Sequence, residues 1–131
     1  MRVKVVSNWV DILAGLGAEG RVKSTLFLGA GTEYTVFGLS LHRESSIYRG
    51  GTLVCKVIDD YGNLTSAPIG IFDVIDGSMP KEWRIEKRFD GVFMWPDLFH
   101  REFFFDDLSE GVPECVAEFR NLRYIMEGEG G

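Results

Sequence analysis

The chain has few of the residues on which metal sites and disulfide frameworks depend. Its 131 residues include only two histidines and two cysteines. A zinc site or a disulfide-stapled fold needs more ligands or more bridges than these can supply, so we expect no metal and no cofactor. Cys55 and Cys115 lie in apolar segments and are expected to be buried thiols. A disulfide between them would require an oxidising compartment.

Long hydrophobic runs are also missing. No window approaches the roughly 18 apolar residues that a membrane-spanning helix needs. Residues 1–7 alternate charged and apolar side chains and lack the apolar core of a secretory signal. We therefore expect a cytoplasmic protein that does not enter a membrane.

Recognisable catalytic patterns are absent as well. Residues 15–20 fit the spacing G-x-G-x-x-G, but a helix is predicted before them and a strand after them, the reverse of the dinucleotide-binding order. The pairs Asp59–Asp60 and Asp106–Asp107 could serve acid–base chemistry only if one carboxyl were desolvated. They are predicted at a turn and at a helix start, where carboxylates stay hydrated. We assign no catalytic residue.

What the chain does have is charge of one sign in one region. The net charge is −6, from 14 basic and 20 acidic residues. Residues 97–131 hold nine acids and three arginines, so this last quarter carries the whole excess. Phosphate contacts need lysine and arginine, which argues against direct nucleic-acid binding. The natural complement is another protein that is basic.

The hydrophobic pattern predicts strands first and helices towards the C-terminus. Strands are expected at residues 2–6, 22–28, 34–42, 52–59, 64–75 and 83–95, a short helix after Asn8, a helical turn at 97–101 and a longer helix ending near Met126. Tight turns favour antiparallel pairing. We predict one α+β domain over residues 1–131, with 127–131 a flexible tail. Its core would be a strongly curved antiparallel sheet or a partly open small β-barrel, on which the short N-terminal helix and the C-terminal helix pack.

The clearest local signal is the dipeptide Asp90-Gly91, which is typical of a two-residue type I′ hairpin turn. Such a turn would set Phe89 opposite Val92. It would also place Phe93 and Trp95 on one face with Arg84, Glu86 and Arg88. Two interpretations of the two rings stay open: the C-terminal helices cover them, or they form an exposed anchor for a partner.

The candidate site is acidic. Its predicted residues are Asp106, Asp107, Glu110, Glu114 and Glu118, with Trp95 as an apolar anchor. The alternative is that these acids are simply the hydrated face of a helix. The neighbouring run of Phe103, Phe104 and Phe105 is too apolar to be left in water and is expected to be buried.

Five stretches carry a resemblance to other proteins: GTEYTV (31–36), CKVIDD (55–60), IFDVID (71–76), KEW (81–83) and residues 105–113, with Phe119 beyond. Over residues 31–123 the chain resembles a loose group of small uncharacterised bacterial proteins regarded as toxin-immunity partners. The resemblance implies an immunity or inhibitor protein that neutralises a basic toxin or nuclease. It implies no catalytic residue.

Two other functions are compatible with the sequence. A small-molecule-binding domain or small enzyme would use an aromatic-lined pocket in the sheet, and would show a cavity holding a carboxyl of raised pKa. An assembly subunit would show a large apolar contact with itself. The sequence does not indicate an oligomeric state.

Overall fold

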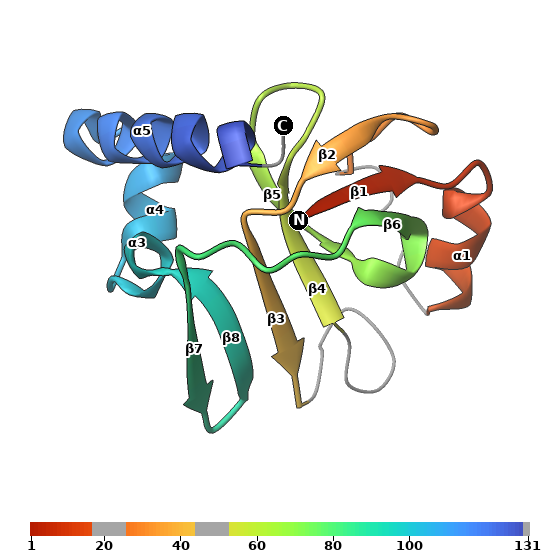
Figure 1. The fold of residues 1–131 in the computed structure, drawn as a ribbon, viewed down its shortest axis with the longest axis horizontal. Coiled ribbons are helices and arrows are strands. Elements are labelled where there is room, and N and C mark those ends of the chain that lie inside the picture. Colours follow the sequence, from red (N-terminus) through yellow and green to blue (C-terminus); the bar gives the residue numbers. More distant parts are fainter. Residues whose placement is uncertain (17–25, 44–52, 130–131) are drawn as a thin grey trace.

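The computed structural model describes residues 1–16, 26–43 and 53–129, which form an α+β fold with two antiparallel sheets (Figure 1). The strands are β1 (Arg2–Val5), β2 (Glu33–Thr35), β3 (Gly38–His42), β4 (Leu53–Ile58), β5 (Leu64–Pro68), β6 (Phe72–Asp76), β7 (Trp83–Arg88) and β8 (Gly91–Pro96). The helices are α1 (Trp9–Gly15), a 3-10 turn η1 (Ile69–Ile71), α3 (Asp97–His100), α4 (Phe104–Ser109) and α5 (Pro113–Glu129). The predicted fold class is confirmed, although the sheets do not close into a barrel.

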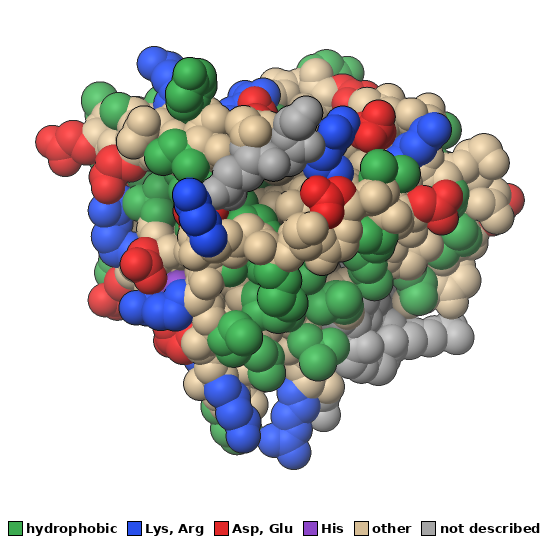
Figure 2. All heavy atoms as spheres, viewed as in Figure 1, with side chains coloured by type: hydrophobic (Ala, Val, Ile, Leu, Met, Phe, Trp, Pro, Cys, Tyr) green, Lys and Arg blue, Asp and Glu red, His purple; other side chains and the backbone are tan. Residues whose placement is uncertain are grey.

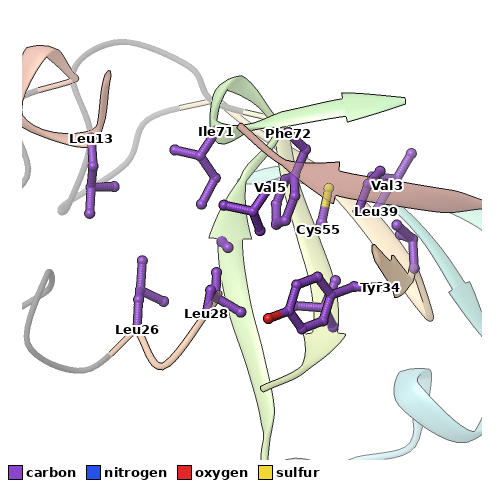
Figure 3. Close-up of a cluster of buried hydrophobic side chains, with 13 residues drawn as sticks. Val3, Val5, Leu13, Leu26, Leu28, Tyr34, Leu39, Cys55, Ile71 and Phe72 are labelled. Carbon is purple, nitrogen blue, oxygen red and sulfur yellow. The ribbon is translucent and has the colours of Figure 1, made fainter. Parts of the chain in front are cut away.

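The smaller sheet has the order β2-β1-β6, and the larger has the order β5-β4-β3-β8-β7. Their facing sides form the first core, in which Val3 and Val5 of β1 meet Leu39 of β3 and Cys55 of β4 (Figure 3). Leu13 extends this core from α1. The buried residues of β1 alternate, so they lie on one face, whereas consecutive residues of β3 and β4 are buried because both faces of these strands are covered.

Two predicted strands are each divided where the chain passes from one sheet to the other. Residues 34–42 separate into β2 and β3 at Val36 and Phe37, both buried. The Val36 amide donates to the Met1 carbonyl, and the Phe37 amide donates to the Lys56 carbonyl. Residues 64–75 are broken in the same way by η1. The side-chain pattern of residues 34–42 does not reveal that two different sheets share this segment.

Residues 26–28 have no strand pairing, so this part of the strand predicted at 22–28 is wrong; residues 22–25 lie outside the described residues. Leu26 and Leu28 nevertheless belong to the first core. Asn8 is the N-cap of α1, but its side chain forms no capping hydrogen bond. The helix itself begins directly after Asn8, as the sequence predicts.

The other face of the larger sheet is covered by α3, α4 and α5 (Figure 1). This second core is largely aromatic and comprises Phe37, Phe93, Trp95, Phe99, Phe104, Cys115, Phe119 and Met126. The predicted helical turn after Pro96 is α3. The sequence did not indicate α4 as a separate helix, and α5 runs beyond Met126 to Glu129.

The hairpin register differs from the predicted one. Arg88 pairs with Gly91, so Phe89 and Asp90 form the loop and the pairing is displaced by two residues along β8. Gly91 is not part of the loop. A glycine is required at this position because a Cβ would collide with the carbonyl oxygen of Leu41 on β3. Because a shift of two residues preserves side-chain alternation, the predicted faces are confirmed.

Part of the larger sheet carries exposed apolar side chains on the face opposite the helices. Leu41 and Ile85 are the most exposed of them, and apolar side chains gather over the lower part of β3, β4 and β8 in the view of Figure 2. The smaller sheet therefore covers only part of this face. Among the described residues, no helix is long and apolar enough to cross a membrane.

Candidate functional site

The five predicted acids lie on two consecutive helices at one end of the molecule. Asp106 and Asp107 are in the first turn of α4 rather than before it, Glu110 follows that helix, and Glu114 and Glu118 are on α5. Asp107 is half-buried and the other four are exposed. Acidic side chains gather over this end, with arginines between them (Figure 2).

Three of these acids surround a single depression. Asp106, Asp107 and Glu110, together with Phe103 and Ser109, line a shallow hollow of about 360 Å³, which we call the acidic hollow. Glu114 and Glu118 do not line it. The structure therefore brings together part of the predicted site and separates the rest.

Phe103 is the residue of this hollow that sequence reasoning missed. Its backbone is left-handed, with φ 61° and ψ 11°, and it is the only non-glycine residue with positive φ in the described part of the chain. The carbonyl of Phe103 accepts a hydrogen bond from the Asp107 amide at 2.9 Å, which starts α4. The ring is 65% exposed, so the expectation that it would be buried is wrong.

Glu118 is neutralised within the molecule. Both of its carboxylate oxygens accept hydrogen bonds from the Arg101 guanidinium, at 2.8 and 2.9 Å. These bonds lower the pKa of Glu118. By contrast, Asp106, Asp107, Glu110 and Glu114 form no ion pair with any described residue. The uncompensated negative charge therefore lies at the acidic hollow and the start of α5.

Trp95 lies inside the second core and does not belong to the surface. Only 7% of it is exposed, and its ring centroid lies 4.7 Å from that of Phe93 and 5.4 Å from that of Phe105. The indole also packs on Gly38, where a Cβ would fall 2.6 Å from its Cδ1 atom. The prediction of Trp95 as an exposed anchor is wrong, because α3 and α4 cover it.

Lys56 lies among these rings and has an unusual environment. Its Nζ atom is 4.3 Å from the centroid of Phe105 and donates a hydrogen bond to Ser66 Oγ at 2.8 Å. Burial lowers the pKa of Lys56 to about 8. No described carboxylate pairs with it, so its charge is destabilising in the folded state.

The other candidate carboxylate pair serves a turn. Asp59 is buried and accepts hydrogen bonds from the Tyr61 and Asn63 amides, at 3.0 and 2.9 Å. Asp60 accepts a bond of 2.6 Å from the Tyr34 hydroxyl. The Asp59 bonds order the β4–β5 connection, and the Asp60 bond ties this connection to β2. Both aspartates also line a hollow of about 360 Å³.

Cys55 and Cys115 are buried free thiols, as predicted, and burial raises the pKa of Cys55 to about 12. Within the described ranges no three or more histidine, cysteine or carboxylate side chains gather to hold a metal ion. The glycine-rich stretch 15–20 lies mostly outside those ranges. Comparison with protein-family models, with curated proteins and with solved structures finds no match for this chain.

Proposed function

We propose that this protein binds a basic segment of another protein at the acidic hollow. An immunity or inhibitor protein would bind a basic toxin or nuclease in this way. A single observation carries the proposal: three carboxylates that form no ion pair within the described part of the chain lie beside an exposed aromatic ring, Phe103.

A lysine or arginine side chain fits this combination of groups. A cation over an aromatic face gains about 0.5–2 kcal/mol, depending on how far it is desolvated. A guanidinium can also donate paired hydrogen bonds to a carboxylate, which fixes orientation as well as adding energy. Asp106 and Glu110 would supply the acceptors, and Phe103 would supply the ring.

The backbone of Phe103 supports a functional role. A left-handed conformation costs a residue with a bulky side chain about 1–2 kcal/mol. Such strain is found preferentially where a binding or catalytic site uses it. Here the strained residue holds a large apolar ring in water beside three carboxylates, an arrangement that a partner would cover.

Capture of partners from an extract of the native cell, at low and at high salt, tests the proposal. The variant Asp106→Asn/Asp107→Asn/Glu110→Gln removes three charges from the hollow. The control Asp11→Asn/Asp73→Asn/Asp90→Asn removes three charges from exposed carboxylates elsewhere. We expect a basic protein to be captured by the wild type and the control at low salt, and to be lost at high salt or with the hollow variant.

Equal loss of the partner in both variants would mean that net charge, and not the hollow, holds it. A partner retained unchanged at high salt would also contradict the proposal, because screening weakens exposed charge pairs.

A catalytic or ligand-binding pocket in the sheet has less support. The aromatic face that would line it is filled by α3, α4 and α5. The carboxyl groups with shifted pKa values, Asp76, Glu86 and Glu118, are all lowered, whereas a general acid needs a raised pKa. The cytoplasm remains our proposed location.

A further inference from the structure

A second hollow, on the other side of Ser109, has the opposite character. It measures about 430 Å³ and lies between the β4–β5 turn and the helices α4 and α5. Its apolar lining comes from Leu64, Leu108, Val116 and Phe119. Ligand-binding sites for small molecules are of this size and are mostly apolar, with a few convergent polar groups.

Two arginines line the same hollow, and we call it the arginine hollow. Arg120 and Arg123 are three residues apart on α5, so their side chains lie on one side of the helix. Arg123 donates to Glu127 at 2.7 Å, which partly neutralises it. Arg120 makes no ion pair or hydrogen bond with any described residue.

An unpaired arginine is unexpected in this part of the chain. Residues 97–131 contain nine acids and only three arginines, and the other two arginines, Arg101 and Arg123, each pair with a glutamate. The guanidinium fork of Arg120 is therefore free to bind an oxyanion in a bidentate manner. Asn63 and Ser109 add polar side chains to the same lining.

We infer that the arginine hollow binds a small organic anion, a carboxylate or phosphate monoester carried on an apolar body. The anionic group would bind Arg120, with Arg123 beside it, and the apolar body would cover Leu108 and Phe119. This inference is independent of the proposed function, because it depends on Arg120 and Arg123 and on a ligand of the opposite charge; the two hollows share only Ser109.

Four naphthalene derivatives of similar size test the inference by titration, followed through backbone amide chemical shifts. They are 2-naphthoate, 2-naphthyl phosphate, neutral 2-naphthylmethanol and cationic 2-naphthylmethylammonium. We expect at least one of the two anions to bind saturably and to shift the amides of Gly62, Asn63 and Val116. The neutral compound should bind about tenfold more weakly, and the cation more weakly still.

The variant Arg120→Gln should weaken binding of the preferred anion about tenfold without changing the thermal midpoint of unfolding, because Arg120 is exposed and pairs with none of the described residues. Arg43→Gln is the control, since Arg43 is also exposed and forms no ion pair with any described residue, but lies beyond the end of β3, over the Phe89 ring. It should bind the anion as the wild type does.

Several outcomes would overturn the inference. They are equal binding of the anionic and neutral compounds, shifts confined to other parts of the chain, no loss on Arg120→Gln, and no saturable binding of either anion. Failure here would leave the acidic hollow untouched, because basic-partner capture and anion titration report on different side chains.

Discussion

At the scale of single residues, Phe103 has a conformation that its side chain disfavours. Its left-handed backbone turns the chain from α3 into α4, while Phe104 next to it is fully buried and stacks on Phe99 with ring centroids 5.4 Å apart. Burial of Phe104 fixes the start of α4, and the corner before it then holds the Phe103 ring in solvent. Local strain and exposure of the ring thus have one cause.

Replacing Phe103 with asparagine separates stability from binding. Asparagine tolerates the left-handed region far better than phenylalanine, and the phenylalanine ring is mostly exposed, so little burial is lost. We expect Phe103→Asn to leave the free energy of unfolding unchanged or to raise it by up to about 1 kcal/mol, measured by urea denaturation.

The same variant should capture less of the basic partner. Tyr124→Asn is its control, because Tyr124 is an exposed ring at a regular position of α5. A clear loss of stability in Phe103→Asn, or equal loss of partner in both variants, would count against a functional role for the Phe103 ring.

The buried position of Lys56 predicts how the stability of the folded chain depends on pH. Its pKa is about 8 in the folded chain and near 10.5 in the unfolded chain. Between these values the unfolded chain keeps a proton that the folded chain has released, so this residue makes stability rise with pH across the window. The full shift corresponds to a free energy on the order of 3 kcal/mol.

Cys55 acts in the opposite direction above pH 9, because the folded chain holds its thiol proton longer. Cys55 is present in both the wild type and Lys56→Met, so its contribution cancels when the unfolding free energies of the two proteins are subtracted. We expect the unfolding free energy of the wild type to rise relative to that of Lys56→Met as pH increases from 8 to 10.5. A difference independent of pH would show that Lys56 is not desolvated.

At the scale of elements, close backbone approach decides the hairpin geometry. Gly91 pairs with His42 of β3 and with Arg88 of β7, in the middle of three neighbouring strands. The dipeptide Asp90-Gly91 correctly located the hairpin. It gave the wrong register because the sequence alone does not show that β3 lies beside β8.

Gly91→Ala tests this explanation. The added Cβ would collide with the Leu41 backbone, which cannot move without disturbing β3. We expect a loss of about 1–3 kcal/mol in the free energy of unfolding. Gly128→Ala is the control, because a Cβ there meets nothing within 4 Å and the residue is helical. It should be neutral or stabilising by up to about 1 kcal/mol. Equal, small effects at both positions would refute the packing explanation.

Much of the architecture could be predicted from apolar periodicity, and the limits follow from what periodicity omits. A strand such as β1 was identified because its buried residues alternate. The division of residues 34–42 into β2 and β3 escaped prediction, since both halves are strands and only their partner strands differ. The acids of the site were found from charge, whereas Phe103 depends on a backbone conformation that no local sequence pattern marks.

At the scale of the whole molecule, α4 and α5 carry two adjacent hollows of opposite charge that share Ser109. Glu118 and Arg101 form an ion pair with each other. Asp106, Asp107, Glu110, Glu114 and Arg120 form no ion pair with any described residue. Internal pairing has therefore left specific charges available. Solubility alone does not require charged side chains to line hollows beside the rings of Phe103 and Phe119.

The most direct test of the central claim is a titration with a short arginine- and lysine-rich peptide, followed through backbone amide chemical shifts at low salt. The account predicts saturable shifts centred on residues 103–110 that disappear in Asp106→Asn/Asp107→Asn/Glu110→Gln and persist in Asp11→Asn/Asp73→Asn/Asp90→Asn. Shifts spread evenly over acidic residues of the whole surface, or unchanged in the first variant, would contradict it.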